Sequence, residues 1–387
     1  MSTKVAVIGQ GYVGLPLALA AAEAGYEVVG IDLDTDRVAA LNAGKSPIGD
    51  ITDGYLSAQS AYYRASTDFA DASGAEVVVL CLPTPLDANR NPDNSMLLSG
   101  ANSVAGFLSD GALIINESTV SPGFTREVLA PIFGSHDLTY SPERIDPANK
   151  NWNVKNTPKL VAGLTEAATS RAVQFYSKFV SSVSPYSSIE VVETAKLLEN
   201  SFRLVNISFI NEIADFCSKM KIDVREVISA ASTKPYGFMP FFPSGGVGGH
   251  CIPVDPTYLA AKAKEIGAST KFIDLANEVN ISRPSYFVGV ATGILGSLSA
   301  KKIVVIGVAY KPDVADIRET PAEPLISLLR SAGADVVWHD HVVGQWKGEA
   351  SAALSSGYDL AILVNPHTGT DLDALGSIPI LDTRGGY

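Results

Sequence analysis

The first thirty-two residues hold the feature that most constrains the fold of this chain. An apolar run from Val5 to Ile8 leads into the glycine-rich turn GQGYVG, and an alanine- and leucine-rich segment follows and ends near Gly25. A second apolar stretch, EVVGID, ends at Asp32. Strand, turn, helix and strand in this order predict a parallel βαβ unit. The GxGxxG spacing and the acid after the second strand predict a dinucleotide-binding site.

Each residue of this turn has a physical reason to be there. Gly9 and Gly11 permit a tight turn and a close approach of the backbone to a pyrophosphate, and Gly14 lets the helix pack tightly on the strand. Tyr12 and Val13 complete the turn at the start of the helix, whose N–H groups and positive dipole end favour an anion. We expect these five residues to bind the cofactor. A βαβ unit without a cofactor is the alternative, and the complete fingerprint argues against it.

Asp32 bears on the choice of cofactor. Its carboxylate can accept hydrogen bonds from ribose hydroxyls, and its charge would repel a 2′-phosphate. The acid therefore favours NAD over NADP. Arg37 complicates this prediction, because a nearby cation could tolerate the phosphate.

Further apolar segments continue the alternation of strands and helices as far as about residue 186. Polar residues stand where these strands end, namely Thr84, Glu117, Thr119 and Glu143. Ligands of open α/β sheets bind at the carboxyl ends of the strands. These four residues are therefore expected at the site.

A long helix is predicted from Ser187 to Met220. Apolar residues recur there at helical spacing, and no breaker interrupts about nine turns. A helix of this length usually connects domains or forms a dimer interface. Lys196 and Asn200 are four residues apart, so they project from one face of the helix.

The last part of the chain reads as a second βαβ unit. An apolar strand spans 302–307, a loop carries Lys311 and Arg318, and a further strand spans 335–338. The glycine fingerprint is missing, because Gly307 is followed by Val-Ala-Tyr. We expect this half to bind a nucleotide by another arrangement.

These patterns predict an α/β protein with two Rossmann-like α/β domains, joined by a long central helix and a helical dimerisation region. The expected parts are a dinucleotide-binding domain at 1–186, a helical region that carries the cysteine loop at 187–295, and a second α/β domain at 296–387. A homodimer through the helical region is expected.

Composition excludes several classes of protein. The net charge is −12 and no basic stripe occurs, so no nucleic-acid partner is expected. No window of about 18 apolar residues lacks charges, so no membrane association is expected, and the N-terminus does not have the pattern of a signal peptide. The cysteines are three in number, too few for a disulfide framework, and they fit a reducing cytoplasm.

Cys251 stands in the stretch GGVGGHCIPVDP and has three possible roles. A metal site would need more histidines or thiolates at ligand spacing than the adjacent His250 provides, so we expect no metal. An inert core cysteine is the role expected for Cys81 and Cys217, which stand in apolar segments. The glycines and prolines around Cys251 favour a nucleophile, since glycines permit close ligand approach and open amides that can hold an oxyanion. His250, Lys196 or a helix dipole would favour the thiolate.

A thiol nucleophile beside a hydride acceptor has a clear chemical use. The thiol adds to an aldehyde and gives a thiohemiacetal, hydride leaves to NAD, and water hydrolyses the resulting thioester. Such a site converts an alcohol into a carboxylate and reduces two NAD.

Nine motifs together resemble the UDP-glucose/GDP-mannose dehydrogenase family. In chain order they are GQGYVGLPLA, CLPTP, EST, SPERIDP, AKLLEN, INEIADFC, GGHCIPVDPTYL, GVAYKPDVADIRETPA and LDTRG. The resemblance implies oxidation of the C6 hydroxyl of a nucleotide sugar to a uronic acid with two NAD. It also implies an N-terminal NAD-binding domain at 1–186, a helical dimerisation core with the catalytic cysteine loop at 187–295, and a C-terminal nucleotide-sugar-binding domain at 296–387.

The resemblance also implies roles for single residues. Cys251 would be the nucleophile, and Lys196 would stabilise developing oxyanions. Asn200 would hold the catalytic water or sugar oxygens, while Asp255 would handle protons around that water.

Further roles are implied on the same basis. Thr119 would position the water, and Glu143 would act as acid and base near the hydrolysis step. Lys311 would bind the sugar or diphosphate, and Arg318 would reach the NAD site. The cofactor would also be lined by Asp32, Arg37, Thr84 and Thr119, and the substrate by Glu143, Arg144, Lys196, Asn200 and Gly248.

The cysteine loop narrows the substrate. HCIPVDPTYL is most similar to the UDP-N-acetylglucosamine 6-dehydrogenase branch of the family, with UDP-glucose and UDP-N-acetylmannosamine as alternatives. A non-catalytic dinucleotide-binding protein is a remote alternative, which would not need Cys251, Lys196, Asn200 and Asp255 together. A 3-hydroxyacid dehydrogenase would use Lys196 without any thiol and would not need the second α/β domain.

Overall fold

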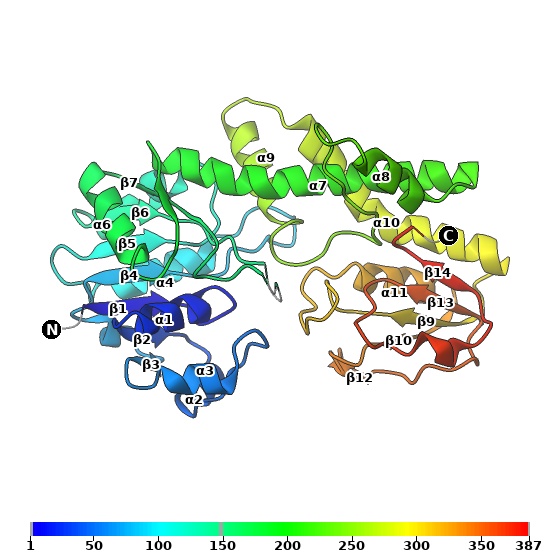
Figure 1. Cartoon of the computed structure of the whole chain (residues 1–387), viewed down its shortest axis with the longest axis horizontal. Helices are drawn as coiled ribbons and strands as arrows, with labels where there is room; N and C mark the ends of the chain where they lie inside the picture. The colour runs from blue at the N-terminus through cyan, green and yellow to red at the C-terminus, as the bar shows by residue number, and fades with distance from the viewer. Residues whose placement is uncertain (1–2, 147–148, 150, 386–387) are drawn as a thin grey trace. The chain divides into compact units, whose positions relative to one another are not determined.

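The computed structural model describes residues 3–146, 149 and 151–385, which fall into two units (Figure 1). Unit 1 comprises Met1–Glu199 and Thr257–Ala268, and unit 2 comprises Asn200–Pro256 and Ser269–Tyr387. Helix α7 (Ile189–Met220) and helix α9 (Asp255–Glu265) contribute residues to both units. The long helix predicted from the apolar periodicity is confirmed by α7.

The described part of unit 1 is built on one sheet. Its strands are β1 (Lys4–Ile8), β2 (Glu27–Ile31), β3 (Tyr63–Ser66), β4 (Val77–Leu80), β5 (Leu113–Asn116), β6 (Asp137–Tyr140), β7 (Lys159–Gly163) and β8 (Val183–Pro185). They pair in the order β3-β2-β1-β4-β5-β6-β7-β8. All pairs are parallel except β6 with β7. The strand order reverses between β1 and β4, where doubly wound sheets bind their ligands.

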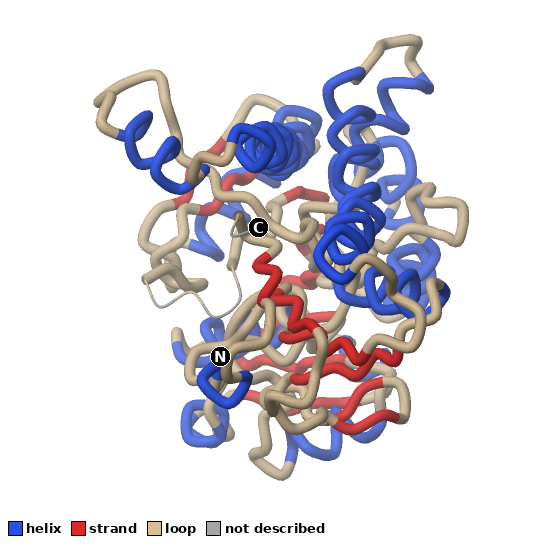
Figure 2. The backbone as a smooth tube through the Cα atoms, turned by 90° about the vertical axis from the view of Figure 1, so that its right-hand side faces the viewer, coloured by secondary structure: helices blue, strands red, loops and turns tan. Residues whose placement is uncertain are grey.

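Helices cover both faces of this sheet. They are α1 (Gly14–Glu23), α2 (Thr35–Asn42), α3 (Asp53–Ala58), α4 (Ser95–Ala105), α5 (Ala130–Phe133) and α6 (Glu166–Tyr176), with the short turns η1 (Phe69–Ala72) and η2 (Thr125–Leu129). Val5 and Val7 pack with α1, α2, α3 and α6, while Ala6 and Ile8 pack with α4, α5 and the start of α7. Because both faces are covered, the central strands β1, β4 and β5 are almost fully buried and do not alternate between buried and exposed residues. Figure 2 shows the backbone with its helices in blue and its strands in red.

The described part of unit 2 has a smaller parallel sheet. Its strands are β9 (Lys302–Ile306), β10 (Asp335–His339), β13 (Leu360–Leu363) and β14 (Ile380–Asp382), in the order β10-β9-β13-β14. The short pair β11 (Gln345–Trp346) and β12 (Glu349–Ala350) lies outside this sheet. The mixed α/β fold with parallel sheets agrees with the fold class predicted from the sequence.

The helices of unit 2 pack on one face of its sheet or against α7. They are α8 (Val224–Ser232), α10 (Lys271–Leu295) and α11 (Ala322–Ser331), with the short turn η3 (Leu372–Leu375). Ile303 and Val305 pack with α10 and α11, and Val304 and Ile306 pack on the opposite side with Leu375 of η3. None of the described helices has both the length and the apolar content needed to cross a bilayer.

Candidate active site

The glycine-rich turn of unit 1 joins β1 to α1. A Cβ on Gly9, whose φ is +93°, would lie 2.4 Å from the carbonyl oxygen of Cys81. A Cβ on Gly14 would lie 1.8 Å from the carbonyl oxygen of Gly9. Close contacts within the protein therefore require glycine at both positions. A Cβ on Gly11 would meet no protein atom within 4 Å, so the space beside this residue fits a ligand that comes close to the backbone.

Asp32 follows β2 and lies beside this turn. One carboxylate oxygen, Oδ2, accepts a hydrogen bond of 2.8 Å from the Gln10 N–H. Arg37 Nη1 lies 3.0 Å from Oδ1 and 2.9 Å from Oδ2. The guanidinium of Arg37 thus offsets the charge of Asp32. Any repulsion of a 2′-phosphate by Asp32 is reduced by the same contact.

A buried ion pair lies at the carboxyl ends of the strands. Glu117 follows β5, and its Oε2 lies 2.6 Å from Lys159 Nζ, with both side chains buried. The Tyr176 hydroxyl donates a hydrogen bond to Glu117 Oε1, and burial followed by the charge of Glu117 raises the pKa of Tyr176 well above its usual range. Glu117 is a strand-end residue named from the sequence, but Lys159 and Tyr176 were missed. A lysine beginning an otherwise apolar strand was the available signal.

Cys81 is the first residue after β4. Desolvation and the nearby charge of Glu117 raise the pKa of its thiol well above the usual range. The thiol is therefore held in its protonated form, which is the poorer nucleophile. Two residues expected at the site, Thr84 and Thr119, follow β4 and β5, the first buried and the second half-buried.

Lys196 on α7 contacts the segment after β6. Its Nζ donates a hydrogen bond of 2.6 Å to the carbonyl oxygen of Glu143 and lies 3.6 Å from Glu143 Oε2. The next residue, Arg144, forms a bidentate ion pair with Glu199, at 2.6 and 3.2 Å. Two residues named from the sequence, Lys196 and Glu143, are therefore in contact, and a third, Arg144, binds the same helix through Glu199.

Glu193, three residues before Lys196, was not found from the sequence. Its Oε2 accepts a hydrogen bond of 2.6 Å from the Gly123 N–H, and its Oε1 accepts one of 3.0 Å from the Thr125 N–H. Burial raises the pKa of Glu193 to about 7, against the opposing effect of these hydrogen bonds. Glu193 therefore anchors the segment that carries Thr119 to the helix that carries Lys196. Its spacing from Lys196 on the same face of the helix was the available signal.

The cysteine loop belongs to unit 2 and is held at several points. The Ser244 N–H donates to Asn211 Oδ1 at 2.8 Å, and the Val247 N–H donates to Asn280 Oδ1 at 2.7 Å. The side-chain amide of Asn280 also donates to the Val247 carbonyl at 3.3 Å. Two buried or half-buried asparagines of α7 and α10 thus fix the approach to Cys251.

Cys251 lies four residues before Asp255, the first residue of α9. Its carbonyl oxygen accepts hydrogen bonds from the Asp255 N–H at 2.8 Å and from the Val254 N–H at 3.2 Å. The turn that carries the cysteine therefore leads into the amino end of α9, near which the helix dipole favours negative charge. None of the described histidines, cysteines or acids gather in a group of three or more that could hold a metal.

Close packing explains why glycine is needed at two positions of this loop. A Cβ on Gly248 would lie 2.7 Å from the Glu319 carbonyl oxygen, and a Cβ on Gly249, whose φ is +83°, would lie 2.7 Å from the Tyr310 ring. The Gly249 N–H donates to the Arg318 carbonyl at 3.0 Å. The sequence argument assigned these glycines to ligand approach and open amides. In the structure they are required because the loop packs against the segment after β9.

Asn200 and Asp255 form a buried pair within unit 2. The Asn200 Nδ2 donates a hydrogen bond of 2.7 Å to Asp255 Oδ2. Lys311 is half-buried in the loop after β9, and Arg318 is bound by Asp316 through Nε at 3.0 Å and Nη2 at 2.6 Å. The expected site residues thus lie in two groups, one on each unit.

Family models match three consecutive parts of the chain. All three describe the UDP-glucose/GDP-mannose dehydrogenase family, with the NAD binding domain at residues 3–180, the central domain at 190–282 and the UDP binding domain at 304–375. The chain belongs to the UDP-glucose/GDP-mannose dehydrogenase family. This dehydrogenase uses NAD as its cofactor and a nucleotide sugar as its substrate class, as the resemblance implied.

Named relatives of the dehydrogenase differ in their sugar. A UDP-N-acetyl-D-glucosamine 6-dehydrogenase of Pseudomonas aeruginosa is 33% identical over 342 residues, which are 84% of this chain and 80% of the relative. A UDP-N-acetyl-D-mannosamine dehydrogenase of Methanococcus maripaludis is 31% identical over 348 residues, 87% and 79% of the two chains. The solved structure of a UDP-D-ManNAc dehydrogenase of Pyrococcus horikoshii has a TM-score of 0.90 and 28% identity, covering 99% of this chain and 95% of that one.

Proposed function

We propose that the dehydrogenase oxidises the C6 hydroxyl of a UDP-N-acetylhexosamine to the uronic acid, with UDP-N-acetylglucosamine as the substrate. The observation that carries the proposal is Cys251 in the turn that leads into α9, in a loop held by hydrogen bonds on both sides. The Asn200–Asp255 pair supports it, since Asp255 begins the same helix.

The proposed chemistry has two oxidation steps. NAD accepts a hydride in each step, and the chain's residues bind, orient and move protons. In the first step the C6 hydroxyl loses a proton and a hydride and becomes an aldehyde. The Cys251 thiolate then adds to the aldehyde carbon, and loss of the second hydride leaves a thioester. Water cleaves the C–S bond, so one alcohol, one water and two NAD give one carboxylate, two NADH and three protons.

Other residues have proposed roles in the same scheme. Lys196 stabilises the oxyanion, Asn200 and Thr119 hold the attacking water, and Glu143 and Asp255 exchange protons with it. Lys196 already donates to the backbone at Glu143, which supports a shared role for the two. Lys311, Arg144 and Gly248 are proposed to contact the nucleotide sugar, and Arg318 the cofactor.

UDP-N-acetylmannosamine is the second candidate substrate. Relatives of both specificities match the chain at similar identity, 33% for the glucosamine enzyme and 31% for the mannosamine enzyme. The solved structure from Pyrococcus horikoshii also carries the mannosamine name. UDP-glucose remains the third candidate.

We also propose a division of labour along the chain. Residues 1–186 bind NAD, residues 187–295 form the dimerisation region and present the cysteine loop, and residues 296–387 bind the UDP-sugar.

A panel of nucleotide sugars tests the proposal. The purified enzyme is given NAD and one sugar at a time, NADH is followed by absorbance, and the product is identified by mass spectrometry. UDP-N-acetylglucosamine should give the highest kcat/KM and two NADH for each uronic acid, with little free aldehyde. A higher kcat/KM with UDP-N-acetylmannosamine would move the assignment to that sugar. One NADH per sugar would leave a simple alcohol dehydrogenase.

A further inference from the structure

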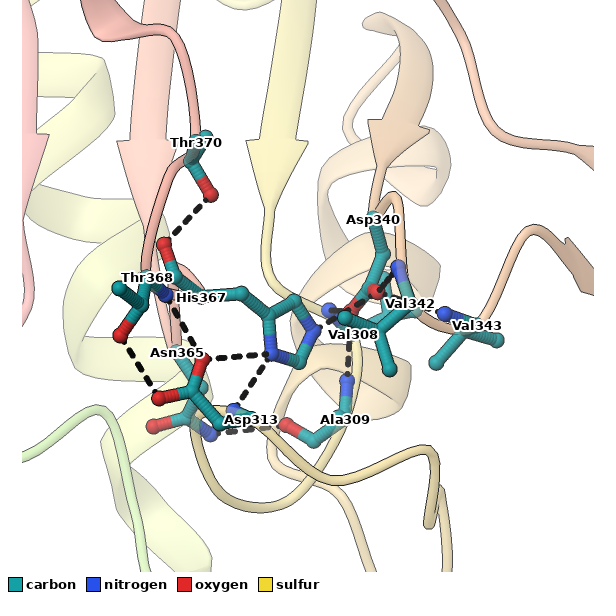
Figure 3. A network of polar contacts seen from close by, with 10 residues as sticks. All are labelled: Val308, Ala309, Asp313, Asp340, Val342, Val343, Asn365, His367, Thr368 and Thr370. Atoms are coloured by element: carbon teal, nitrogen blue, oxygen red, sulfur yellow. Dashed lines mark hydrogen bonds and ion pairs between the residues drawn. The ribbon is translucent and has the colours of Figure 1, made fainter. Parts of the chain in front are cut away.

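A buried aspartate closes the turn after β9. Asp340 Oδ2 accepts hydrogen bonds from the N–H groups of Val308, at 2.9 Å, and Ala309, at 3.1 Å. Its Oδ1 accepts from the N–H groups of Val342 and Val343, at 3.0 and 2.8 Å. The side chain is 0% exposed. Figure 3 shows the carboxylate at the centre of these contacts.

The same position in unit 1 has a different role. Gly9 and Gly307 begin equivalent turns, since each N–H donates to the last residue of the neighbouring strand. Asp32 and Asp340 each follow that strand. Asp32 accepts a hydrogen bond from one amide of its turn, that of Gln10. Asp340 accepts from two consecutive amides of its turn, so the acid in unit 2 uses the donors that a phosphate would need.

His367 connects Asp340 to the loop that follows the turn. Its Nδ1 accepts a hydrogen bond of 2.7 Å from the Asp313 N–H, and its Nε2 lies 2.7 Å from Asp340 Oδ1. A backbone N–H can only donate, so Nδ1 must be the acceptor and Nε2 must carry the proton that is donated to Asp340. Burial alone would raise the pKa of Asp340, but the hydrogen bonds from His367 and the backbone hold it below its usual value.

Asp313 has a φ of +63°, a conformation that non-glycine residues rarely adopt. Three contacts maintain it, because His367 accepts from its N–H and the N–H and hydroxyl of Thr368 donate to its carboxylate, at 2.8 and 2.7 Å. These contacts are drawn in Figure 3. The loop is thus fixed at Asp313 as well as at the turn.

The segment between these two fixed points carries Tyr310 and Lys311. The side-chain amide of Asn365 donates to the Tyr310 carbonyl at 3.1 Å. The Tyr310 ring packs against Gly249, since a Cβ on that glycine would lie only 2.7 Å from the ring. Gly249 is two residues before Cys251. A shift of Tyr310 would therefore reach the cysteine loop by direct packing, because no side chain lies between them.

We propose that Asp340 and His367 are positioning residues, which hold the segment Val308–Asp313 so that Lys311 faces the nucleotide sugar and Tyr310 sets the loop before Cys251. This inference rests on the proposed function, in which Lys311 and Cys251 act on the substrate. Neither Asp340 nor His367 needs to touch the substrate for this purpose.

Two substitutions of one residue separate the two hydrogen bonds of His367. In His367→Asn the amide oxygen replaces Nδ1 as acceptor for the Asp313 N–H, and the donor to Asp340 is lost. In His367→Gln the longer amide replaces Nε2 as donor to Asp340, and the acceptor for Asp313 is lost. Asp340→Asn removes the charge, and Asp373→Asn is a matched control at an exposed aspartate of the same unit.

The readouts report on the loop and do not depend on turnover alone. UDP affinity is measured by calorimetry, and the rate of Cys251 alkylation by iodoacetamide is measured by peptide mass spectrometry. KM and kcat for the nucleotide sugar are measured in parallel. NAD affinity and thermal unfolding show whether each variant is folded.

If His367 positions the segment Val308–Asp313, its two variants should differ in UDP affinity. His367→Gln should weaken UDP binding and raise KM by about tenfold, since one buried hydrogen bond is lost. Its Cys251 alkylation rate should change severalfold, while NAD affinity stays within twofold. His367→Asn should keep UDP affinity within about threefold of the wild type, and Asp373→Asn should equal the wild type.

A uniform result would overturn the inference. If both His367 variants lower the melting temperature but leave UDP affinity and Cys251 alkylation within twofold of the wild type, the pair is only structural. If Asp340→Asn does not fold, the His367 variants still decide. If the wild type makes no NADH with any nucleotide sugar, the proposed function fails, whereas UDP affinity and alkylation still test the positioning of the loop.

Discussion

The side chain of Asn200 donates a hydrogen bond of 2.7 Å to the carboxylate of Asp255, and both side chains are buried. Asp255 is the first residue of α9, and its own N–H donates to the carbonyl of Cys251. The carboxylate is therefore fixed one helical turn from the cysteine. A buried carboxylate held by an amide donor is suited to orient or accept a proton from a water.

Asp255→Asn tests this relationship. It places one amide against another, so a buried hydrogen bond is weakened and the carboxylate is lost. We expect kcat to fall by about 100-fold or more and the free energy of unfolding to fall by about 1–3 kcal/mol, with NAD affinity unchanged. Steady-state kinetics and denaturant unfolding measure the two effects. Glu265→Gln, at an exposed residue of the same helix, should leave kcat unaltered, and a full kcat in Asp255→Asn would remove Asp255 from the proposed chemistry.

Cys251→Ser should lower the rate of uronic acid formation by several orders of magnitude, because a hydroxyl without a dedicated base is a much poorer nucleophile than a thiolate. NAD affinity should be retained, since the glycine-rich turn is on the other unit. Product analysis by mass spectrometry and calorimetry with NAD check the two statements. Cys217→Ala, at a buried cysteine of α7, is the matched control and should retain turnover. Near-normal acid formation in Cys251→Ser would show that the thiol is structural.

The contact between Arg37 and Asp32 leads to a prediction on cofactor choice. The wild type should use NAD at least about tenfold better than NADP, as expected from an acid at this position. Asp32→Ala frees the Arg37 guanidinium, so the ratio of kcat/KM for NAD to that for NADP should fall. Arg37→Ala exposes the charge of Asp32, so the same ratio should rise. If both variants keep the wild-type ratio, neither residue reads the ribose.

The elements of the fold could be predicted from the sequence where their signal is local. The strands β1 and β9 are continuous apolar runs, and α7 has an unbroken helical period, so each was found close to its observed bounds. The fingerprint glycines and Cys251 were found because glycine spacing and a rare residue are visible in one short stretch.

The polar pairs of the interior could not be predicted in the same way. Glu193 binds the amide of Gly123, 70 positions away, and His367 binds Asp340, 27 positions away. Such pairs depend on the strand order, which brings distant segments together and leaves no periodic trace. The glycines before Cys251 show a related limit: their spacing indicates that no Cβ fits, but not whether a ligand or the chain fills the space.

The exposed side of α7 predicts the oligomeric state. Phe202, Phe209 and Phe216 recur every seven residues and are 46%, 58% and 57% exposed, and Leu198 adds to the same side at 62%. A second copy of the chain would bury this apolar stripe. Light scattering should give a dimer, and Phe209→Glu should shift it toward monomer. Leu33→Glu, at a 72% exposed residue far from α7 in the sequence, should stay dimeric, whereas a monomeric wild type would contradict the prediction.

Glu193 predicts how stability depends on pH. Burial raises its pKa to about 7 in the folded chain, whereas an unfolded glutamate titrates near 4.5. The native state therefore holds a proton that the unfolded state releases, so the contribution of Glu193 is full below about pH 4.5 and is lost as the pH rises to 7. Relative to Glu193→Gln, the wild type should lose up to about 3 kcal/mol of unfolding free energy between pH 4 and 8. Denaturant unfolding at several pH values measures this difference, in which the constant cost of the glutamine amide cancels.

Glu190→Gln is the control on the same helix, because Arg126 lowers the pKa of Glu190 to about 2, so its difference from the wild type should stay flat between pH 5 and 8. A flat difference for Glu193→Gln as well would mean that the Gly123 and Thr125 amides keep Glu193 ionised throughout, and that the segment carrying Thr119 is anchored equally at all of these pH values.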